Sequence, residues 1–230
     1  MIITIDGPVA SGKSTISKLL ADRLDYYYIN SGLLYRSVAY IFIFEYGYTD
    51  KDLYNIAYQE VKDFFLSKKI SYSYVPNNGA SLLFNKSNIT PYLKDTRVEN
   101  SASIVAKNLQ VRQAILEYQR TLADDHNIIA EGRDTGTVVF PDAEFKFFIT
   151  ACLIERTKRW INDTKRLNNK NISFEESLEF IRQRDQRDIK RPVAPLKPAL
   201  NAIIIDNSNM TIEETLNFII NIIKDKKPNK

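Results

Sequence analysis

The chain has 230 residues, of which 44% are hydrophobic and 26% are charged, and its formal net charge at pH 7 is +4. These values are ordinary for a soluble globular protein, and the basic tail at 224–230 is expected to be a solvated end rather than a nucleic-acid-binding arm. The single cysteine, Cys152, excludes an internal disulfide framework and a cysteine metal cluster. Its position after an apolar run predicts an inert thiol in the core.

Arg36 and Glu45 bracket the apolar run at 41–44 too closely for a membrane span. The chain opens on a strand-like run rather than a signal peptide, so we expect a cytoplasmic protein.

Apolar periodicity predicts strands that alternate with helices along the chain. Strands are expected at 2–6, 26–29, 127–131, 144–150 and 202–206. Helices are expected at 13–24, 33–45, 50–67, 97–106, 109–123, 153–167, 174–190 and 212–225. Capping boxes begin the last two helices, at Ser173 to Glu176 and at Thr211 to Glu214, and Pro192 stops the helix at 174–190. The alternation predicts an α/β fold around a parallel sheet with right-handed crossovers.

Residues 70–95 interrupt this alternation. Two strand-like runs, 70–75 and 81–85, flank the turn signal at 76–79. Such a pattern predicts a β-hairpin, here as a small antiparallel insert between the second and third core strands.

The most informative motif is Gly-Pro-Val-Ala-Ser-Gly-Lys-Ser at 7–14, which follows a strand and opens a helix. This is the P-loop pattern in its usual context. Gly7 and Gly12 let successive N–H groups turn inward around a phosphate, and the helix N-terminus faces the same way. Lys13 is expected to reach the β- and γ-phosphates, and the Ser14 hydroxyl is placed for Mg²⁺. The motif predicts binding of a nucleoside triphosphate.

A second feature is a polar stripe, in which Arg184, Arg187, Asp188 and Arg191 share one face of a predicted helix. Further charged residues surround the stripe, namely Arg182, Asp185 and Lys190. The stripe is therefore either a solvated, salt-bridged face or part of a site for an anion.

Two other segments favour the site. Arg133 and Asp134 follow the strand at 127–131, and residues 31–36 follow the second strand. Ligands bind at these carboxyl ends of strands in open α/β sheets. Arginines from three segments could converge on the P-loop, and such an excess indicates a second phosphorylated ligand held by bidentate contacts.

The kind of acceptor follows from the shortage of a general base. A hydroxyl acceptor usually needs one, whereas a phosphate monoester is already ionised near neutral pH. The only histidine, His126, lies in a polar turn and is expected at the surface. Residues 85–88 miss the guanine signature of GTPases. The pattern favours phosphate-to-phosphate transfer.

Four segments of the chain resemble bacterial cytidylate kinases: 6–15, 31–36, 131–142 and 184–196. The resemblance runs nearly from end to end, and the last two segments are the most specific. It implies a single P-loop kinase domain over 1–230, with a three-layer fold and a five-stranded parallel sheet. It also implies an enlarged monophosphate-binding region at 31–112, with the antiparallel insert at about 68–95, and a short lid at 155–172. The implied activity is transfer of the ATP γ-phosphate to CMP or dCMP with Mg²⁺.

The resemblance also implies roles for single residues. The catalytic set would be Lys13, Arg133, Asp134 and Arg184. The ATP side would comprise Gly7, Pro8, Val9, Ala10, Ser11, Gly12, Lys13, Ser14, Thr15 and the lid residues Arg156 and Arg159, with Arg166 as a further lid candidate. The acceptor phosphate would be surrounded by Ser31, Tyr35, Arg36 and Arg133. Cytosine would be recognised by Ser103, Arg112, Asp134 and Arg191, and the sugar by Arg184 and Asp188. Mg²⁺ would be held by Ser14 directly and by Glu131 through water. The turn at 206–210 resembles the loop beside the adenine.

Some positions depart from the family pattern. The lid has Arg159-Trp160 where paired arginines are common, and Lys94 stands where an arginine is expected. Thr150 and Cys152 also differ from the commonest residues there. Two alternatives stay open: a P-loop kinase that accepts UMP equally or acts on a hydroxyl, and a nucleotide-sensing or nucleic-acid-binding module without turnover. We expect a monomer without a nucleic-acid or membrane partner.

Overall fold

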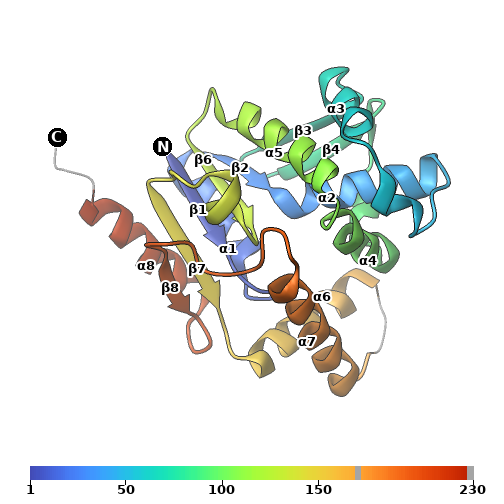
Figure 1. The fold of residues 1–230 in the computed structure, drawn as a ribbon. Coiled ribbons are helices and arrows are strands. Elements are labelled where there is room, and N and C mark those ends of the chain that lie inside the picture. The colour runs from blue at the N-terminus through green and yellow to red at the C-terminus, as the bar shows by residue number, and fades with distance from the viewer. Residues whose placement is uncertain (169–171, 227–230) are drawn as a thin grey trace. The chain divides into compact units, whose positions relative to one another are not determined.

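The computed structural model describes residues 1–168 and 172–226 (Figure 1). The strands are β1 (Ile2–Asp6), β2 (Tyr27–Asn30), β3 (Ile70–Val75), β4 (Gly79–Phe84), β5 (Ser87–Asn88), β6 (Ile128–Gly132), β7 (Phe145–Thr150) and β8 (Ile203–Asp206). The α-helices are α1 (Lys13–Leu24), α2 (Ser31–Tyr40), α3 (Tyr58–Leu66), α4 (Thr96–Val105), α5 (Leu109–Ala123), α6 (Leu153–Asn168), α7 (Phe174–Lys190) and α8 (Ile212–Lys226). Short 3₁₀-helices cover Asp52–Asn55 and Thr90–Lys94, and π-helical turns cover Ile41–Glu45 and Thr135–Val139.

The central sheet has five parallel strands in the order β2-β6-β1-β7-β8, which confirms the predicted α/β class. β1 runs parallel to β7 with Ile3 opposite Phe145, and β7 runs parallel to β8 with Phe147 opposite Ile203. The side chains of β1 after Ile2 are all buried, as expected for a parallel strand covered on both faces.

The chain divides into two compact units. Unit 1 comprises Met1–Leu24 and Ile129–Lys230, and unit 2 comprises Asp25–Ile128. The P-loop and the described part of the predicted lid lie in unit 1. The predicted monophosphate-binding region at 31–112 lies in unit 2.

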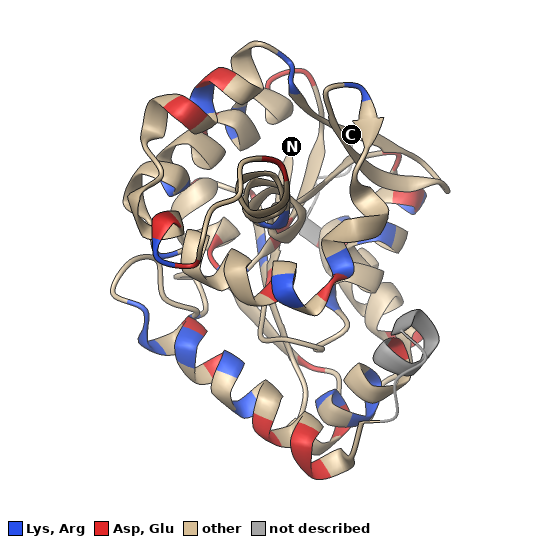
Figure 2. Ribbon diagram, turned by 90° about the vertical axis from the view of Figure 1, so that its right-hand side faces the viewer, with Lys and Arg blue, Asp and Glu red and all other residues tan. Residues whose placement is uncertain are grey.

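In unit 1, α6 and α7 lie side by side. The predicted capping box of α7 is present, because Ser173 Oγ accepts a bond from Glu176 N at 3.1 Å and Glu176 Oε2 accepts one from Ser173 N at 3.0 Å. The equivalent pair at Thr211 and Glu214 caps α8. Acidic residues occupy the first turn of α7 and basic residues its last turn, as the helix dipole favours; Figure 2 shows this charge distribution along the ribbon.

In unit 2, β3 and β4 form the predicted hairpin, with Ile70 opposite Phe84 and Val75 opposite Gly79. A third strand, β5, follows a tight turn and pairs antiparallel with β4. The turn residues Asn85 and Lys86 have φ values of 48° and 69°. Both lie in the left-handed region that a two-residue hairpin turn requires, but Asn-Lys lacks the glycine that marks such turns in a sequence.

The predicted helix at 50–67 is wrong as a continuous element. It is a 3₁₀ turn at Asp52–Asn55 followed by α3, and Ala57 between them is extended. The Asn108 side-chain amide donates to the carbonyls of Leu53, Tyr54 and Ile56 at 3.4, 3.1 and 2.9 Å. Those oxygens therefore bond outside their own segment, which stops the helix.

The predicted helix at 33–45 also differs in form. α2 begins at Ser31, because Asn30 Oδ1 accepts a bond from Leu33 N at 3.0 Å and caps the first turn. The chain leaves α-helical geometry after Tyr40 and continues as the π-helical turn Ile41–Glu45.

The prediction of a buried Cys152 is wrong, since this thiol is exposed. β7 ends at Thr150 and α6 begins at Leu153, so Cys152 lies in the connection, where its N–H donates to Ser208 Oγ at 2.7 Å. His126 is exposed, as predicted. Over residues 1–168 and 172–226, no helix combines the length and apolar character needed to cross a membrane.

Candidate active site

The P-loop connects β1 to α1 in a conformation that needs glycine at two positions. A Cβ on Gly7 would lie 2.0 Å from the carbonyl oxygen of Ile149, so only glycine fits there. Gly12 has φ +84° and Ala10 has φ 57°, which turns the backbone as in anion-binding nests. Gly12 O accepts the first helical bond, from Ile16 N at 3.1 Å. The loop therefore carries its N–H groups into the N-terminus of α1, where an anion is favoured.

Asp185 on α7 and Arg156 on α6 fasten this loop to their two helices. Asp185 Oδ1 accepts a bond from Val9 N at 3.3 Å, and Asp185 Oδ2 accepts one from Arg156 Nη1 at 2.5 Å. Arg156 also donates to Val9 O at 3.2 Å and to Ala151 O at 2.9 Å. Val9 is thus held at both its N–H and its carbonyl by one buried ion pair.

Arg159 and Asn207 hold the next part of the loop. Arg159 Nη1 donates to Ser11 O at 3.3 Å and to Asn207 Oδ1 at 2.9 Å, while Asn207 Nδ2 donates to Ser11 O at 3.1 Å. The turn at 206–210, predicted to lie beside the adenine, is therefore tied to the phosphate loop. The side chain of Arg166, the further lid candidate, lies outside the described residues.

Lys13 is buried, and its Nζ donates to Pro8 O at 2.9 Å. Burial and the positive charges of Arg133 and Arg184 together lower the pKa of Lys13 to about 7, against the opposing charges of Glu131 and Asp188. A triphosphate placed on the loop would supply the negative charge that favours the ammonium form.

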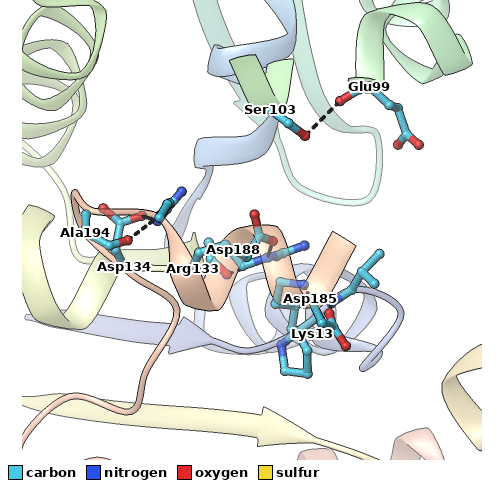
Figure 3. A network of polar contacts seen from close by, with 12 residues as sticks. Lys13, Glu99, Ser103, Arg133, Asp134, Asp185, Asp188 and Ala194 are labelled. Carbon is cyan, nitrogen blue, oxygen red and sulfur yellow. Dashed lines mark hydrogen bonds and ion pairs between the residues drawn. The ribbon is translucent and has the colours of Figure 1, made fainter. Parts of the chain in front are cut away.

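Arg133 forms an ion pair with Asp188, and Figure 3 shows the two side chains pointing toward each other. Arg133 Nε lies 2.8 Å from Asp188 Oδ2, and both side chains are largely buried. Burial raises the pKa of Asp188, but the charges of Arg133, Arg184 and Arg191 outweigh it and lower the pKa below its usual value. Asp188 is therefore ionised at neutral pH.

Asp134 forms a second buried pair, with Arg191. Arg191 Nη2 donates to Asp134 Oδ1 at 2.9 Å, and Arg191 Nε donates to Ala194 O at 2.5 Å. Both side chains are less than a tenth exposed. The carboxylate of Asp134 is thus held by a guanidinium that is itself held by the following loop.

The predicted stripe is only partly helical. α7 ends at Lys190, and Arg191 is its extended C-cap with ψ 137°. Arg187 is exposed, whereas Asp185, assigned to the charged surroundings of the stripe, is buried. The face of α7 that enters the site therefore carries Arg184, Asp185 and Asp188.

In unit 2, the residues predicted to hold the acceptor phosphate lie on α2 and contact α4 and α5. Arg36 Nη2 lies 2.6 Å from Glu99 Oε1, and the hydroxyl of Ser31 donates to Gln119 Oε1. Ser103 lies one helical turn after Glu99 on α4, and its hydroxyl donates to Glu99 O at 3.4 Å (Figure 3).

Arg112 and Tyr35 form a cation–π contact in the same unit. The guanidinium of Arg112 lies 5.6 Å from the centroid of the Tyr35 ring, and its Nη1 donates to Ala106 O at 3.3 Å. The five residues predicted for the site in this unit lie on three helices, and α2, which carries Ser31, Tyr35 and Arg36, contacts both α4 with Ser103 and α5 with Arg112.

The residues suggested for Mg²⁺ suit that ion. Ser14 is exposed at the start of α1, and Glu131 is buried at the end of β6, close enough to influence the pKa of Lys13. Within the described chain, no cluster of three or more His, Cys, Asp or Glu side chains could hold a metal alone. One hydroxyl and one carboxylate fit Mg²⁺, which keeps several waters and takes further ligands from substrate phosphates.

The cytidylate kinase family model matches residues 3–225 of the chain. The chain belongs to the cytidylate kinase family. It is 39% identical over 224 residues to the cytidylate kinase of Thermotoga maritima, with 97% of each chain covered. It is 38% identical to the cytidylate kinase of Clostridium botulinum strain Langeland, with 96% of this chain and 97% of that one covered. An uncharacterized protein from Eubacterium ventriosum shares the fold, with a TM-score of 0.54 at 13% identity over 98% of this chain and 99% of that chain.

One residue that departs from the cytidylate kinase pattern, Trp160, packs against an aromatic side chain of the next helix. Trp160, at the second position of the lid pair, packs against Phe180 with ring centroids 4.9 Å apart. The indole thus joins α6 to α7 where an arginine would present charge. Lys94 is exposed at the end of the 3₁₀-helix Thr90–Lys94, and nothing in the structure explains this substitution.

The sequence pattern missed two acidic residues that hold predicted site residues: Glu99, which pairs with Arg36, and Asp185, which holds Val9 and Arg156. Asp185 had a usable signal, because it lies three residues before Asp188 and so shares its helix face. Glu99 had none, since its partner Arg36 is far away in the sequence and on another helix.

Proposed function

We propose that the chain transfers the γ-phosphate of ATP to CMP or dCMP. One observation carries the proposal: the P-loop with its buried Lys13 shares a unit with two arginine–aspartate pairs, the largely buried Arg133–Asp188 and the buried Arg191–Asp134. In the reaction, a phosphate oxygen of the monophosphate forms a bond to the γ-phosphorus. The bond from that phosphorus to the β–γ bridging oxygen breaks, and ADP and CDP or dCDP result.

The arrangement supports an acceptor that needs no general base. The carboxylates of Asp134, Asp185 and Asp188 each accept a hydrogen bond from an arginine, which suits positioning better than proton removal. A phosphate monoester arrives ionised and needs charge neutralisation and in-line placement. Arg133 and Arg184, with Lys13, would neutralise the charge on the transferring group.

Mg²⁺ would be held by Ser14 directly and by Glu131 through water. The ion would supply positive charge that neutralises the negative charge developing on the phosphate groups. The ATP side would further comprise residues 7–15, with Arg156 and Arg159 acting from outside the loop, where they hold its carbonyls.

Cytosine recognition is proposed for Asp134, Arg191 and Arg112. An ionised carboxylate can only accept, so Asp134 suits the 4-amino group of cytosine, and guanidinium groups can only donate, so they suit N3 and O2. Uracil would set its 4-oxygen against the carboxylate and its N3–H against a guanidinium. Ser103 would add a further contact to the base.

The remaining residues are proposed to contact the rest of CMP. Ser31, Tyr35 and Arg36 would bind its phosphate together with Arg133, and Arg184 and Asp188 would bind its sugar. The ion pair with Glu99 already orients the Arg36 guanidinium, so its remaining N–H donors would point in a fixed direction.

A coupled assay with Mg·ATP and CMP, dCMP, UMP, AMP or shikimate as acceptor tests the proposal. We expect kcat/KM for CMP to exceed that for UMP by at least about 10²-fold, within the range of sites whose buried polar groups match one substrate. Comparable efficiencies for UMP and CMP would favour a general pyrimidine kinase. Turnover of shikimate alone would indicate a hydroxyl acceptor, and steady absence of turnover would indicate a binding module.

We further propose that the chain acts as a monomer in the cytoplasm, without a nucleic-acid or membrane partner. Light scattering at assay concentration tests the monomer, and fractionation of cells that express the chain tests its location.

A further inference from the structure

The carboxylate of Asp6 lies at the end of β1, directly before the P-loop, and accepts three hydrogen bonds from the segment that follows Asp134. Its Oδ1 accepts from Thr135 N at 2.9 Å and from Thr135 Oγ1 at 2.8 Å, and its Oδ2 accepts from Gly136 N at 2.8 Å. Asp6 is 3% exposed. These bonds connect the β1 end to the turn that carries the proposed base-reading carboxylate.

The turn also sits against β1 too closely for any side chain at Gly136. A Cβ there would lie 2.7 Å from Thr4 Oγ1 and 3.5 Å from Asp6 Oδ2. Glycine at this position therefore lets the backbone of the turn approach β1, and Asp6 meets the N–H groups that this approach would otherwise bury without acceptors.

The backbone of Asp134 is fixed by the same turn. Its carbonyl accepts bonds from Val138 N at 2.9 Å and Val139 N at 3.3 Å. Thr135 O accepts a bond from Phe140 N at 2.7 Å, which closes the π-helical turn. The backbone of Asp134 is therefore bonded into the same turn that Asp6 holds through Thr135 and Gly136.

We propose that Asp6 is a positioning residue for base discrimination, which holds the turn at 135–136 and thereby fixes the Asp134 carboxylate against the pyrimidine. The inference rests on the proposed function, because it concerns which base the same site prefers.

Packing of the core alone does not explain why residue 6 is an aspartate. Burial raises the pKa of Asp6 to about 6, against the lowering effect of the bonds from Gly136 and Thr135. A buried charge is costly unless it is well paired, and a neutral side chain would fill the same volume without that cost. The two backbone N–H groups and one hydroxyl directed at Asp6 are what the carboxylate satisfies.

The first test is Asp6→Asn with CMP and UMP as alternative acceptors. Asparagine keeps one acceptor oxygen, but its amide nitrogen cannot accept the bond from Gly136 N. We expect the ratio of kcat/KM for CMP to that for UMP to shrink about tenfold, mainly through lost CMP activity, with the KM for ATP within about twofold of wild type. A folded variant in which CMP and UMP efficiencies fall together, at constant ratio, would overturn the proposal.

A matched pair at Thr135 keeps the test decisive if Asp6→Asn does not fold. Thr135→Val removes one of the three bonds at nearly constant volume, and Thr135→Ser keeps the hydroxyl. We expect the CMP/UMP ratio to shrink about threefold in Thr135→Val and to stay within about twofold in Thr135→Ser. Equal ratios in the two variants would overturn the proposal.

The wild-type enzyme separates this inference from the proposed function. A wild type without CMP turnover, or without preference for CMP over UMP, contradicts the proposed function and with it the role of Asp6. A CMP-selective wild type with equally selective Asp6→Asn and Thr135→Val variants contradicts only the role of Asp6.

Discussion

The arginines proposed to bind substrate are held differently in the two units. In unit 1, Arg133, Arg156 and Arg191 each donate to an aspartate, at 2.8, 2.5 and 2.9 Å. In unit 2, Arg36 pairs with Glu99, and Arg112 donates to the carbonyl of Ala106 and lies over the ring of Tyr35. A guanidinium paired with a deeply buried carboxylate is oriented before any ligand arrives, and the Arg36–Glu99 side chains, 22% and 18% exposed, are less buried than those of Arg191 and Asp134, at 7% and 8%. Preorganised charge is what transition-state stabilisation requires, so the larger catalytic effects are expected from unit 1.

The largest effect is expected from Lys13→Ala. Loss of the buried ammonium removes preorganised positive charge from the phosphate loop, and kcat should fall by about 10²-fold or more. Lys18→Ala is the matched control, because Lys18 lies on the same helix but pairs with Asp22 outside the site. Steady-state assays with saturating ATP and CMP measure both variants. A near-normal kcat in Lys13→Ala would show that the P-loop is not the catalytic centre.

A smaller effect is expected from Asp185→Asn, which removes the negative charge between Val9 and Arg156. The loop should lose its fixed shape, so that kcat/KM for ATP falls about tenfold, as expected for a lost charged hydrogen bond. The KM for CMP should change little. Glu155→Gln, which affects an exposed pair with Lys158 on α6, should have almost no effect. Equal losses in the two variants would show that burial of the pair is unimportant.

Arginine-to-lysine replacements compare the two units directly. Arg191→Lys cannot keep both the Nη2 bond to Asp134 and the Nε bond to Ala194, and it should reduce kcat/KM for CMP about tenfold or more. Arg112→Lys keeps the charge and part of the contact with Tyr35, and it should reduce the same quantity about threefold. If Arg112→Lys proves the more damaging, unit 1 is not the better preorganised of the two units.

The smallest effect concerns stability and pH. The pKa of Asp6 is raised from 3.8 to about 6 in the folded protein, and the neighbouring negative charge of Asp134 contributes to this shift after burial. The folded state therefore holds the proton more tightly than the unfolded state. The associated stabilisation is complete below the unfolded pKa and is lost as pH rises through the folded value. The Tm of wild type minus that of Asp6→Asn should fall by about 2–4 °C between about pH 5 and pH 7. A difference that grows with pH would contradict the raised pKa.

The sequence predicted well what depends on local patterns. The helices at 13–24, 109–123 and 174–190 have the expected bounds, because caps and apolar periodicity act within a few residues. Breaks imposed from a distance were not predictable, as with Asn108, whose amide ends the segment before α3. The same holds within the site: motif residues such as Arg36 were identified, but its partner Glu99 was not.

Two predictions were wrong because a helix or strand pattern was extended past the residue at which the element ends. The stripe spacing treated Arg191 as helical, although Pro192 restricts the preceding residue to extended conformations and Arg191 adopts one. That change of backbone is what lets Arg191 reach both Asp134 and Ala194. Cys152 was assigned to the core by its apolar neighbours, but the strand had already ended at Thr150.

The bonds around the P-loop also bear on the order in which ligands enter. The carbonyl oxygens of Pro8, Val9, Ser11 and Gly12 all accept hydrogen bonds, from lysine, arginine, asparagine or a helical N–H. A loop with its acceptors engaged in this way offers mainly donors to an incoming molecule, so it distinguishes ligands by the sign of their charge. A bare divalent cation would find little there, whereas a triphosphate would find a complementary surface. Ser14 and Glu131 are too few to hold Mg²⁺ alone, so the ion is expected to bind tightly only together with the phosphate oxygens of the nucleotide.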